Sequence, residues 1–129
     1  MFEDKEKNME TISQYQEQLQ YSEVYISDMV ALKKIFIQNT GAKKITAGFG
    51  IPFLLIKKKN EIIAFASLII NENGAIGFTI YEKRNLTSSE KKNFAFRAES
   101  YSKKNNAPNF RNPEQLKSSI HQLINWLND

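Results

Sequence analysis

Residues 53–82 read FLLIKKKNEIIAFASLIINENGAIGFTIYE, and this stretch decides the fold class. It divides into three runs of β-branched, aromatic and aliphatic residues, separated by turn-forming residues at Lys59-Asn60 and Asn73-Gly74. Asn-Gly is a strong signal for a two-residue type I′ turn, because both residues tolerate a positive φ. The stretch therefore predicts a three-stranded antiparallel meander.

The two turns also fix a register for the expected sheet. The Asn-Gly turn pairs Ile69 with Phe78, and the Lys-Asn turn pairs Ile56 with Ile63. One face then carries large side chains, at Leu54, Ile56, Ile63, Phe65, Ile69, Ile76, Phe78 and Ile80. The other face includes small residues, and it carries Phe53, Leu55, Ile62, Ala64, Ala66, Leu68, Ile70 and Tyr81. Because both faces are apolar, each must be covered by a helix, a second subunit or a ligand.

Local signals place the elements that surround the meander. A short strand is expected over residues 21–26, and helices over residues 28–39, 88–104 and 113–127. Gly41 suits the C-cap of the first helix, and Thr87 with Glu90 forms the capping box of the second. Asn112-Pro113 opens the third helix, whose apolar repeat is the clearest in the chain. The fold class is thus α+β, with a central antiparallel sheet covered by helices.

Length and composition limit the classes of protein to which the chain can belong. The chain has 129 residues, so residues 21–129 are expected to form a single domain, preceded by a weak helix or flexible arm over residues 1–20. It contains no cysteine, which excludes disulfides, thiolate metal sites and cysteine nucleophiles. Six of its first ten residues are charged, and no run approaches the roughly 18 apolar residues of a membrane span. A soluble cytoplasmic protein with no membrane partner is expected.

Charge is distributed unevenly along the chain. Residues 1–26 hold six acids and two lysines, whereas residues 27–129 hold sixteen bases and eight acids. A basic body of this kind is able to attract phosphorylated ligands or nucleic acid. A solvated basic surface explains the same composition, and nucleic-acid binding is kept as the second alternative.

Few residues are candidates for chemistry. His121 is the only histidine, and it lies at the margin of an apolar helical stripe, so a structural or surface role and no metal site are expected. Tyr81, at the end of the third strand of the meander, precedes two cations, Lys83 and Arg84, and the helix start at Thr87. A phenol, two cations and a helix N-terminus together form the best candidate for receiving an anion.

The order of elements resembles the first part of the GNAT fold of acyl-CoA N-acyltransferases. The matching text is VYISDMVALKKIF, PFLLIKKKNEIIAFASLII and AIGFTIYEKRN, within about residues 21–100. In that family a loop of the form Arg/Gln-x-x-Gly-x-Gly/Ala follows the fourth strand and binds pyrophosphate. Here residues 84–89 read RNLTSS, so the arginine is present and both glycines are missing.

The resemblance implies a possible acetyl-CoA site. The coenzyme's amides would pair with the fourth strand at Phe78, Thr79 and Ile80, its phosphates would meet Arg84 and the helix start at Thr87, and Tyr81 would donate a proton to the leaving thiolate.

The absence of a recognisable catalytic set favours a different reading, a non-catalytic GNAT-like protein that binds another protein or a second copy of itself. An acyl-CoA-dependent N-acetyltransferase is the first alternative.

Overall fold

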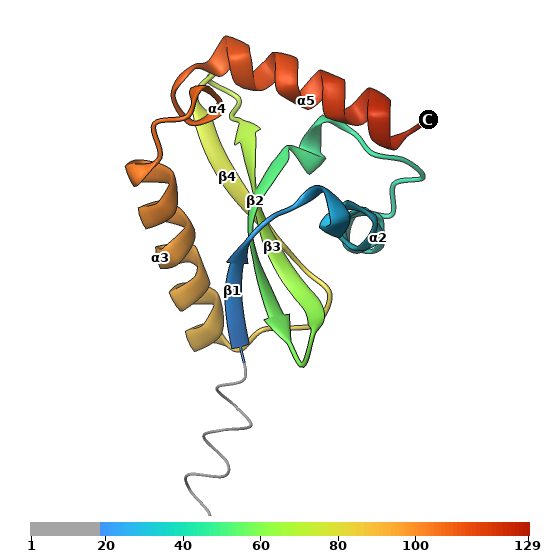
Figure 1. Ribbon diagram of the computed structural model, residues 1–129, viewed down its shortest axis with the longest axis vertical. Coiled ribbons are helices and arrows are strands. Elements are labelled where there is room, and N and C mark those ends of the chain that lie inside the picture. The colour runs from blue at the N-terminus through green and yellow to red at the C-terminus, as the bar shows by residue number, and fades with distance from the viewer. Residues whose placement is uncertain (1–18) are drawn as a thin grey trace, which may run out of the picture.

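The structure is a computed structural model that describes residues 19–129. The helix or arm expected over residues 1–20 lies outside this range, except for Leu19 and Gln20, which belong to the first strand. The described part of the chain is α+β, with one antiparallel sheet in the order β1-β2-β3-β4 (Figure 1). Its strands are β1 (Leu19–Glu23), β2 (Ile51–Lys58), β3 (Glu61–Ile70) and β4 (Ile76–Glu82).

Helices cover both faces and one end of the sheet. They are α2 (Met29–Thr40), α3 (Ser88–Lys104), the short α4 (Pro108–Arg111) and α5 (Pro113–Leu127), with 3-10 turns η1 (Ile26–Asp28) and η2 (Ala47–Phe49). In Figure 1, α3 lies on one side of the sheet, α2 on the other, and α5 crosses the end where β3 finishes. No helix in residues 19–129 is long and apolar enough to cross a membrane.

The local helix signals are confirmed. Gly41 ends α2 with φ 71° and donates its N–H to Ile37, and Thr87 with Glu90 forms the capping box of α3. The side chain of Asn112 accepts the N–H of Gln115 at the start of α5.

One expectation near the chain's beginning is not met. The first strand occupies Leu19–Glu23 instead of residues 21–26, because the chain turns at η1, where Tyr25 N–H donates to the Asp28 carboxylate at 2.8 Å. The short helix α4 was not expected from the sequence.

The type I′ geometry expected at Asn73-Gly74 is found instead at Lys59-Asn60. Lys59 and Asn60 both have positive φ, 52° and 66°, as a type I′ turn requires. At the second hairpin only Gly74 has a positive φ, 84°, and Asn73 instead accepts the N–H of Ala75 with its side chain. Residues 72–74 therefore form the loop, which is the pattern of a turn followed by a left-handed glycine.

This longer loop shifts the pairing of β3 with β4 by one residue. Ile69 lies opposite Gly77, so the expected pairing of Ile69 with Phe78 is wrong. Irregularities in β2–β3 have a similar effect, because Ile56 lies opposite Ala64 and not Ile63. Each bulge leaves one residue without a partner across the ladder, and such an insertion has no simple local signal.

The shifted register changes which residues share a face. Ala64 and Ala66 belong to the same core as the large Ile56, and helix α3 packs there through Phe94 and Ala98. The cover over these small residues is therefore a helix of the same chain. The α3-side core contains Phe53, Leu54, Ile56, Ile63, Ala64, Ala66, Leu68, Leu86, Phe94, Ala98, Leu116 and Ile120. The α2-side core contains Leu32, Ile35, Phe36, Ile45, Phe49, Leu55 and Phe65.

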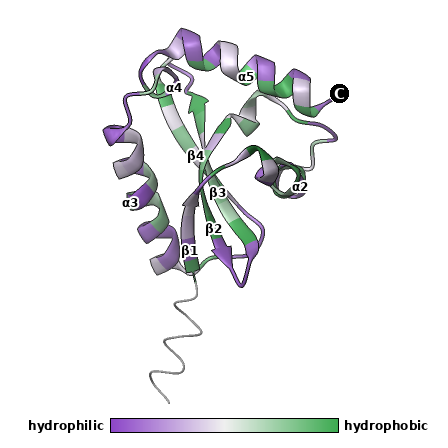
Figure 2. Cartoon of the chain, in the orientation of Figure 1, coloured by the Kyte–Doolittle hydropathy of each residue, from purple (hydrophilic) through white to green (hydrophobic). Residues whose placement is uncertain are grey.

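Hydropathy follows this division into layers. Figure 2 shows hydrophobic colour concentrated along the strands, whereas α3 and α5 alternate between hydrophobic and hydrophilic. Helix α5 contributes to both cores, because Leu116 and Ile120 join one while Leu123 and Leu127 pack against the other. It therefore closes the end of the sheet instead of covering a single face.

The turn η2 is fixed tightly to the end of β3. The hydroxyl of Ser67, fully buried, donates to the carbonyl of Phe49 at 2.5 Å. Gly50 has φ 66°, and a Cβ built on it would lie 2.0 Å from the carbonyl oxygen of Leu68. Only glycine allows this backbone approach, which places η2 against β3.

Candidate functional site

The residues expected to form one site along β4 lie on two faces of the sheet. Phe78 and Ile80 pack against the α3-side core. Thr79 and Tyr81 line a cleft on the other face, between η2 and α5. This separation follows from the alternation of side chains along a strand.

The cations after β4 already have a partner. Lys83 Nζ lies 2.6 Å from Glu61 Oε2, and Arg84 pairs with the other oxygen of the same carboxylate. The hydrogen bond from Lys83, followed by the charges of Arg84 and Lys83, holds the pKa of Glu61 below its usual value. Arg84 is thus engaged by an internal anion at the first turn of the meander.

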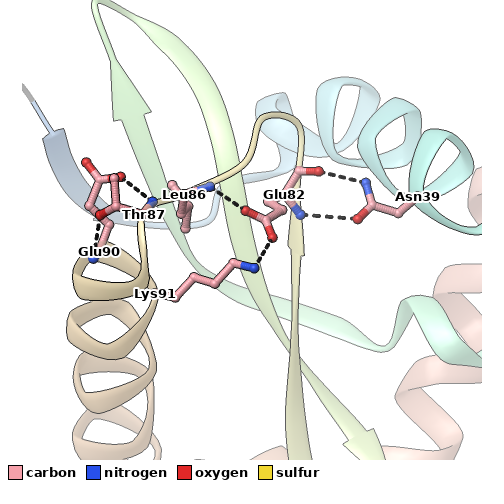
Figure 3. A network of polar contacts seen from close by, with 6 residues as sticks. All are labelled: Asn39, Glu82, Leu86, Thr87, Glu90 and Lys91. Atoms are coloured by element: carbon pink, nitrogen blue, oxygen red, sulfur yellow. Dashed lines mark hydrogen bonds and ion pairs between the residues drawn. The ribbon is translucent and has the colours of Figure 1, made fainter.

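The start of α3 is also occupied by carboxylates, as Figure 3 shows. Glu82 accepts the N–H of Leu86 at 2.7 Å and pairs with Lys91 at 2.9 Å. Glu90 accepts the N–H of Thr87 at 2.9 Å, and the Thr87 hydroxyl accepts the N–H of Glu90 at 3.1 Å. A phosphate at this helix start would have to displace these internal acceptors and approach two negative charges.

Tyr81 is held by packing and by a hydrogen bond. Its hydroxyl donates to the carbonyl oxygen of Gly48 at 2.5 Å, and its ring meets Phe36 edge-on at 5.2 Å between centroids. Burial raises the pKa of the phenol, so the group stays protonated at neutral pH. The proton is directed at η2, which gives Tyr81 a clear structural role in holding η2 to β4.

The cleft beside Tyr81 gathers residues that are distant in the sequence. It has a volume of about 520 Å³ and lies between η2, the ends of β3 and β4, and α5. Helix α5 contributes Lys117 and His121, and β4 contributes Thr79 and Tyr81. The sequence predicts a structural or surface role for His121 and gives no role to Lys117. Their four-residue separation was the available signal, since it places both on one side of a helix.

The outer edge of β4 presents main-chain groups to its surroundings. Lys83 N–H donates to Ile63 O and Asn71 N–H to Ala75 O, so the odd-numbered residues of β4 face β3. The even-numbered residues therefore point their N–H and C=O groups outward. The outward main-chain groups of Glu82 are already bonded to Asn39, whose side-chain amide donates to Glu82 O at 2.8 Å and accepts from Glu82 N at 3.4 Å.

The remaining outward groups belong to Ile76, Phe78 and Ile80. Their outward main-chain groups have no hydrogen-bond partner within residues 19–129. Between Ile76 and Tyr81 the strand also has no charge, no proline and no shift of register against β3. These are the usual devices that protect an edge strand from pairing with another chain, and β4 has none of them there.

Within residues 19–129 there is no group of three or more histidine, cysteine, aspartate or glutamate side chains that could hold a metal ion. Comparison of the chain with models of protein families, with curated protein sequences and with solved structures gave no match.

Proposed function

We propose that this chain is a non-catalytic, GNAT-like cytoplasmic protein that associates with a second copy of itself through the edge of β4. The observation that carries the proposal is the row of outward main-chain groups at Ile76, Phe78 and Ile80, which lack partners in residues 19–129. The element order β1, α2, β2 to β4 and α3 supports the GNAT-like part. Strand addition at an open edge is a common mode of protein recognition.

The edge is complementary to itself. If two β4 strands pair antiparallel with Phe78 opposite Phe78, Ile76 of each copy stands opposite Ile80 of the other. Each of these pairs would exchange two main-chain hydrogen bonds, because all of the residues involved point outward. The sheets of the two copies would then be continuous, and the Ile and Phe side chains of both would form one apolar row.

Asn39 supports this register. Its side chain occupies the outward N–H and C=O of Glu82, the next outward residue after Ile80. The open part of the edge is therefore limited to Ile76–Tyr81. The proposed register uses only this open part and leaves the Asn39 contact undisturbed. It also keeps Glu82 of one copy away from the apolar row of the other.

The carboxylates at the start of α3 support a binding role over acyl transfer. Glu82 and Glu90 accept the N–H groups of Leu86 and Thr87, where the family resemblance implies a pyrophosphate. Arg84, the one residue that matches the family loop, is paired with Glu61. We therefore expect acetyl-CoA to leave the melting temperature unchanged, since a ligand that binds the folded state must raise it.

The decisive experiment combines sedimentation velocity with a proline substitution in the edge strand. Ile80→Pro removes an outward N–H that has no partner in the described chain, and proline is tolerated on edge strands. We expect the wild-type protein to sediment as a dimer and Ile80→Pro as a monomer with an unchanged circular dichroism spectrum. Ile80→Ala is the matched control, because it shortens the side chain and keeps the N–H, and it should remain dimeric.

Amide hydrogen exchange on the wild-type protein tests the same contact without a substitution. The amides of Ile76, Phe78 and Ile80 should be protected at high protein concentration and lose protection on dilution. A wild-type monomer, or a dimer in which these amides exchange freely, would contradict the proposal. A rise in melting temperature with acetyl-CoA would instead support the acyltransferase, and DNA or RNA binding at low salt would support the basic-surface alternative.

A further inference from the structure

The cleft between η2, β4 and α5 is lined by two basic side chains and by no acidic one. Lys117 and His121 stand one helical turn apart on α5, and none of the residues that line the cleft carries a carboxylate. No hydrogen bond or ion pair joins either side chain to another group within residues 19–129. This contrasts with Lys83 and Lys91, which are held by Glu61 and Glu82.

The rest of the cleft is apolar, with one free hydroxyl. Ile69 and Ile120 come from β3 and α5, and Ala47 comes from η2. Thr79 lines the same space and its hydroxyl has no hydrogen-bond partner in the described chain, whereas the Tyr81 hydroxyl donates to Gly48. Apolar walls with a few convergent polar groups are typical of small-molecule sites, and a volume of about 520 Å³ is within their usual range.

We propose that this cleft binds a small amphipathic carboxylate. The carboxylate would lie beside Lys117 and His121 and accept a hydrogen bond from Thr79. A short aliphatic body would contact Ile69 and Ile120. The charge of the site selects an anion, and the small number of donors suits a single carboxylate better than a multiply charged group.

Titration with sodium hexanoate tests this proposal on the full chain. Binding should be saturable and should shift the backbone NMR signals of Thr79, Lys117 and His121. Hexylamine has a chain of similar length and the opposite charge, so it should not bind. The amides of Phe78 and Ile80 should respond less than that of Thr79, because their side chains lie on the other face of the sheet, which separates this site from self-association at the edge.

Two substitutions test the assigned roles. Lys117→Met keeps an unbranched apolar side chain and removes the charge, and it should weaken hexanoate binding by roughly tenfold or more. Thr79→Val keeps the shape and removes the hydroxyl, and it should weaken binding less. Lys92→Met, on α3 at the opposite face of the sheet, is the matched control and should bind as the wild type does.

The outcomes are distinguishable from a folding defect, because each variant is first required to show wild-type circular dichroism and cooperative unfolding. Equal binding of hexanoate and hexylamine would overturn the proposal, as would wild-type affinity in Lys117→Met. The proposal is also overturned if hexanoate shifts signals outside the cleft only.

Discussion

Gly50 is the position where a single methyl group should test the packing of the candidate site. It has φ 66° and ψ −154°, and a Cβ would lie 2.0 Å from the carbonyl oxygen of Leu68 and 3.0 Å from the side chain of Ile69. The near contact is with backbone, so a side-chain rotation cannot relieve it. Gly50→Ala must therefore either displace η2 or distort the end of β3.

Two costs combine in Gly50→Ala. Holding alanine in a backbone region that is essentially restricted to glycine costs about 1–3 kcal/mol. Inserting a methyl group into a closely packed position costs about 1–3 kcal/mol more. The sum, about 2–6 kcal/mol, is a large part of the roughly 5–15 kcal/mol by which a domain is stable, and at roughly 3–5 °C per kcal/mol it corresponds to a fall in melting temperature of roughly 6–30 °C.

Gly74→Ala separates the two costs. Gly74 also has a positive φ, 84°, but a Cβ built there has nothing within 4 Å. Gly74→Ala should therefore lower the free energy of unfolding only by the backbone cost, about 1–2 kcal/mol. Urea unfolding followed by circular dichroism measures both variants, and a difference between them below about 0.5 kcal/mol would refute the close approach of Gly50 to β3.

The remaining predictions concern contacts that surround the site. Ser67→Ala should lower the free energy of unfolding by about 1–3 kcal/mol in urea unfolding, because the carbonyl of Phe49 loses its donor; an unchanged midpoint would contradict this. Tyr81→Phe keeps the ring packing and loses the bond to Gly48, so the same assay should show a smaller loss, about 0.5–1.5 kcal/mol. The lowered pKa of Glu61 means that its ion pairs stabilise the fold above the unfolded value of 4.5 and fade as pH falls through the folded value. Glu61→Gln should therefore lose stability at neutral pH and show a flatter decline in melting temperature on acidification, and a decline equal to that of the wild type would count against the pairing.

Much of the helical structure could be predicted because its signals are local. The capping box at Thr87 and the Asn112-Pro113 start act over a single turn, and α3 and α5 begin where these signals place them. The α+β class also follows from the sequence, since a meander that is apolar on both faces requires helices on each side. Residues 1–18 lie outside the described structure, and the expectation for them stays a prediction.

The register of the sheet could not be predicted from turn residues alone. Asn73 has the identity expected at a type I′ turn, yet its side chain accepts the N–H of Ala75 and only Gly74 takes a positive φ. The irregularities in β2–β3 fall at Phe53 and Ile63, which both belong to the core beneath α3. Such choices are made by packing between distant segments, and a shift of one residue moves side chains to the other face.

The candidate site was predictable only in part. The sequence selected Thr79 and Tyr81, which do line a cleft, and it also selected Arg84 and Thr87, whose polar groups are taken by neighbouring carboxylates.

The sequence by itself determined the α+β class, the helix starts and the absence of cysteine chemistry. Only the tertiary structure brought His121 from α5 to Tyr81 of β4 and left the edge at Phe78 open. The physical reason is range, because caps and turns act over a few neighbouring residues, whereas clefts and free strand edges arise from the packing of segments far apart in the chain.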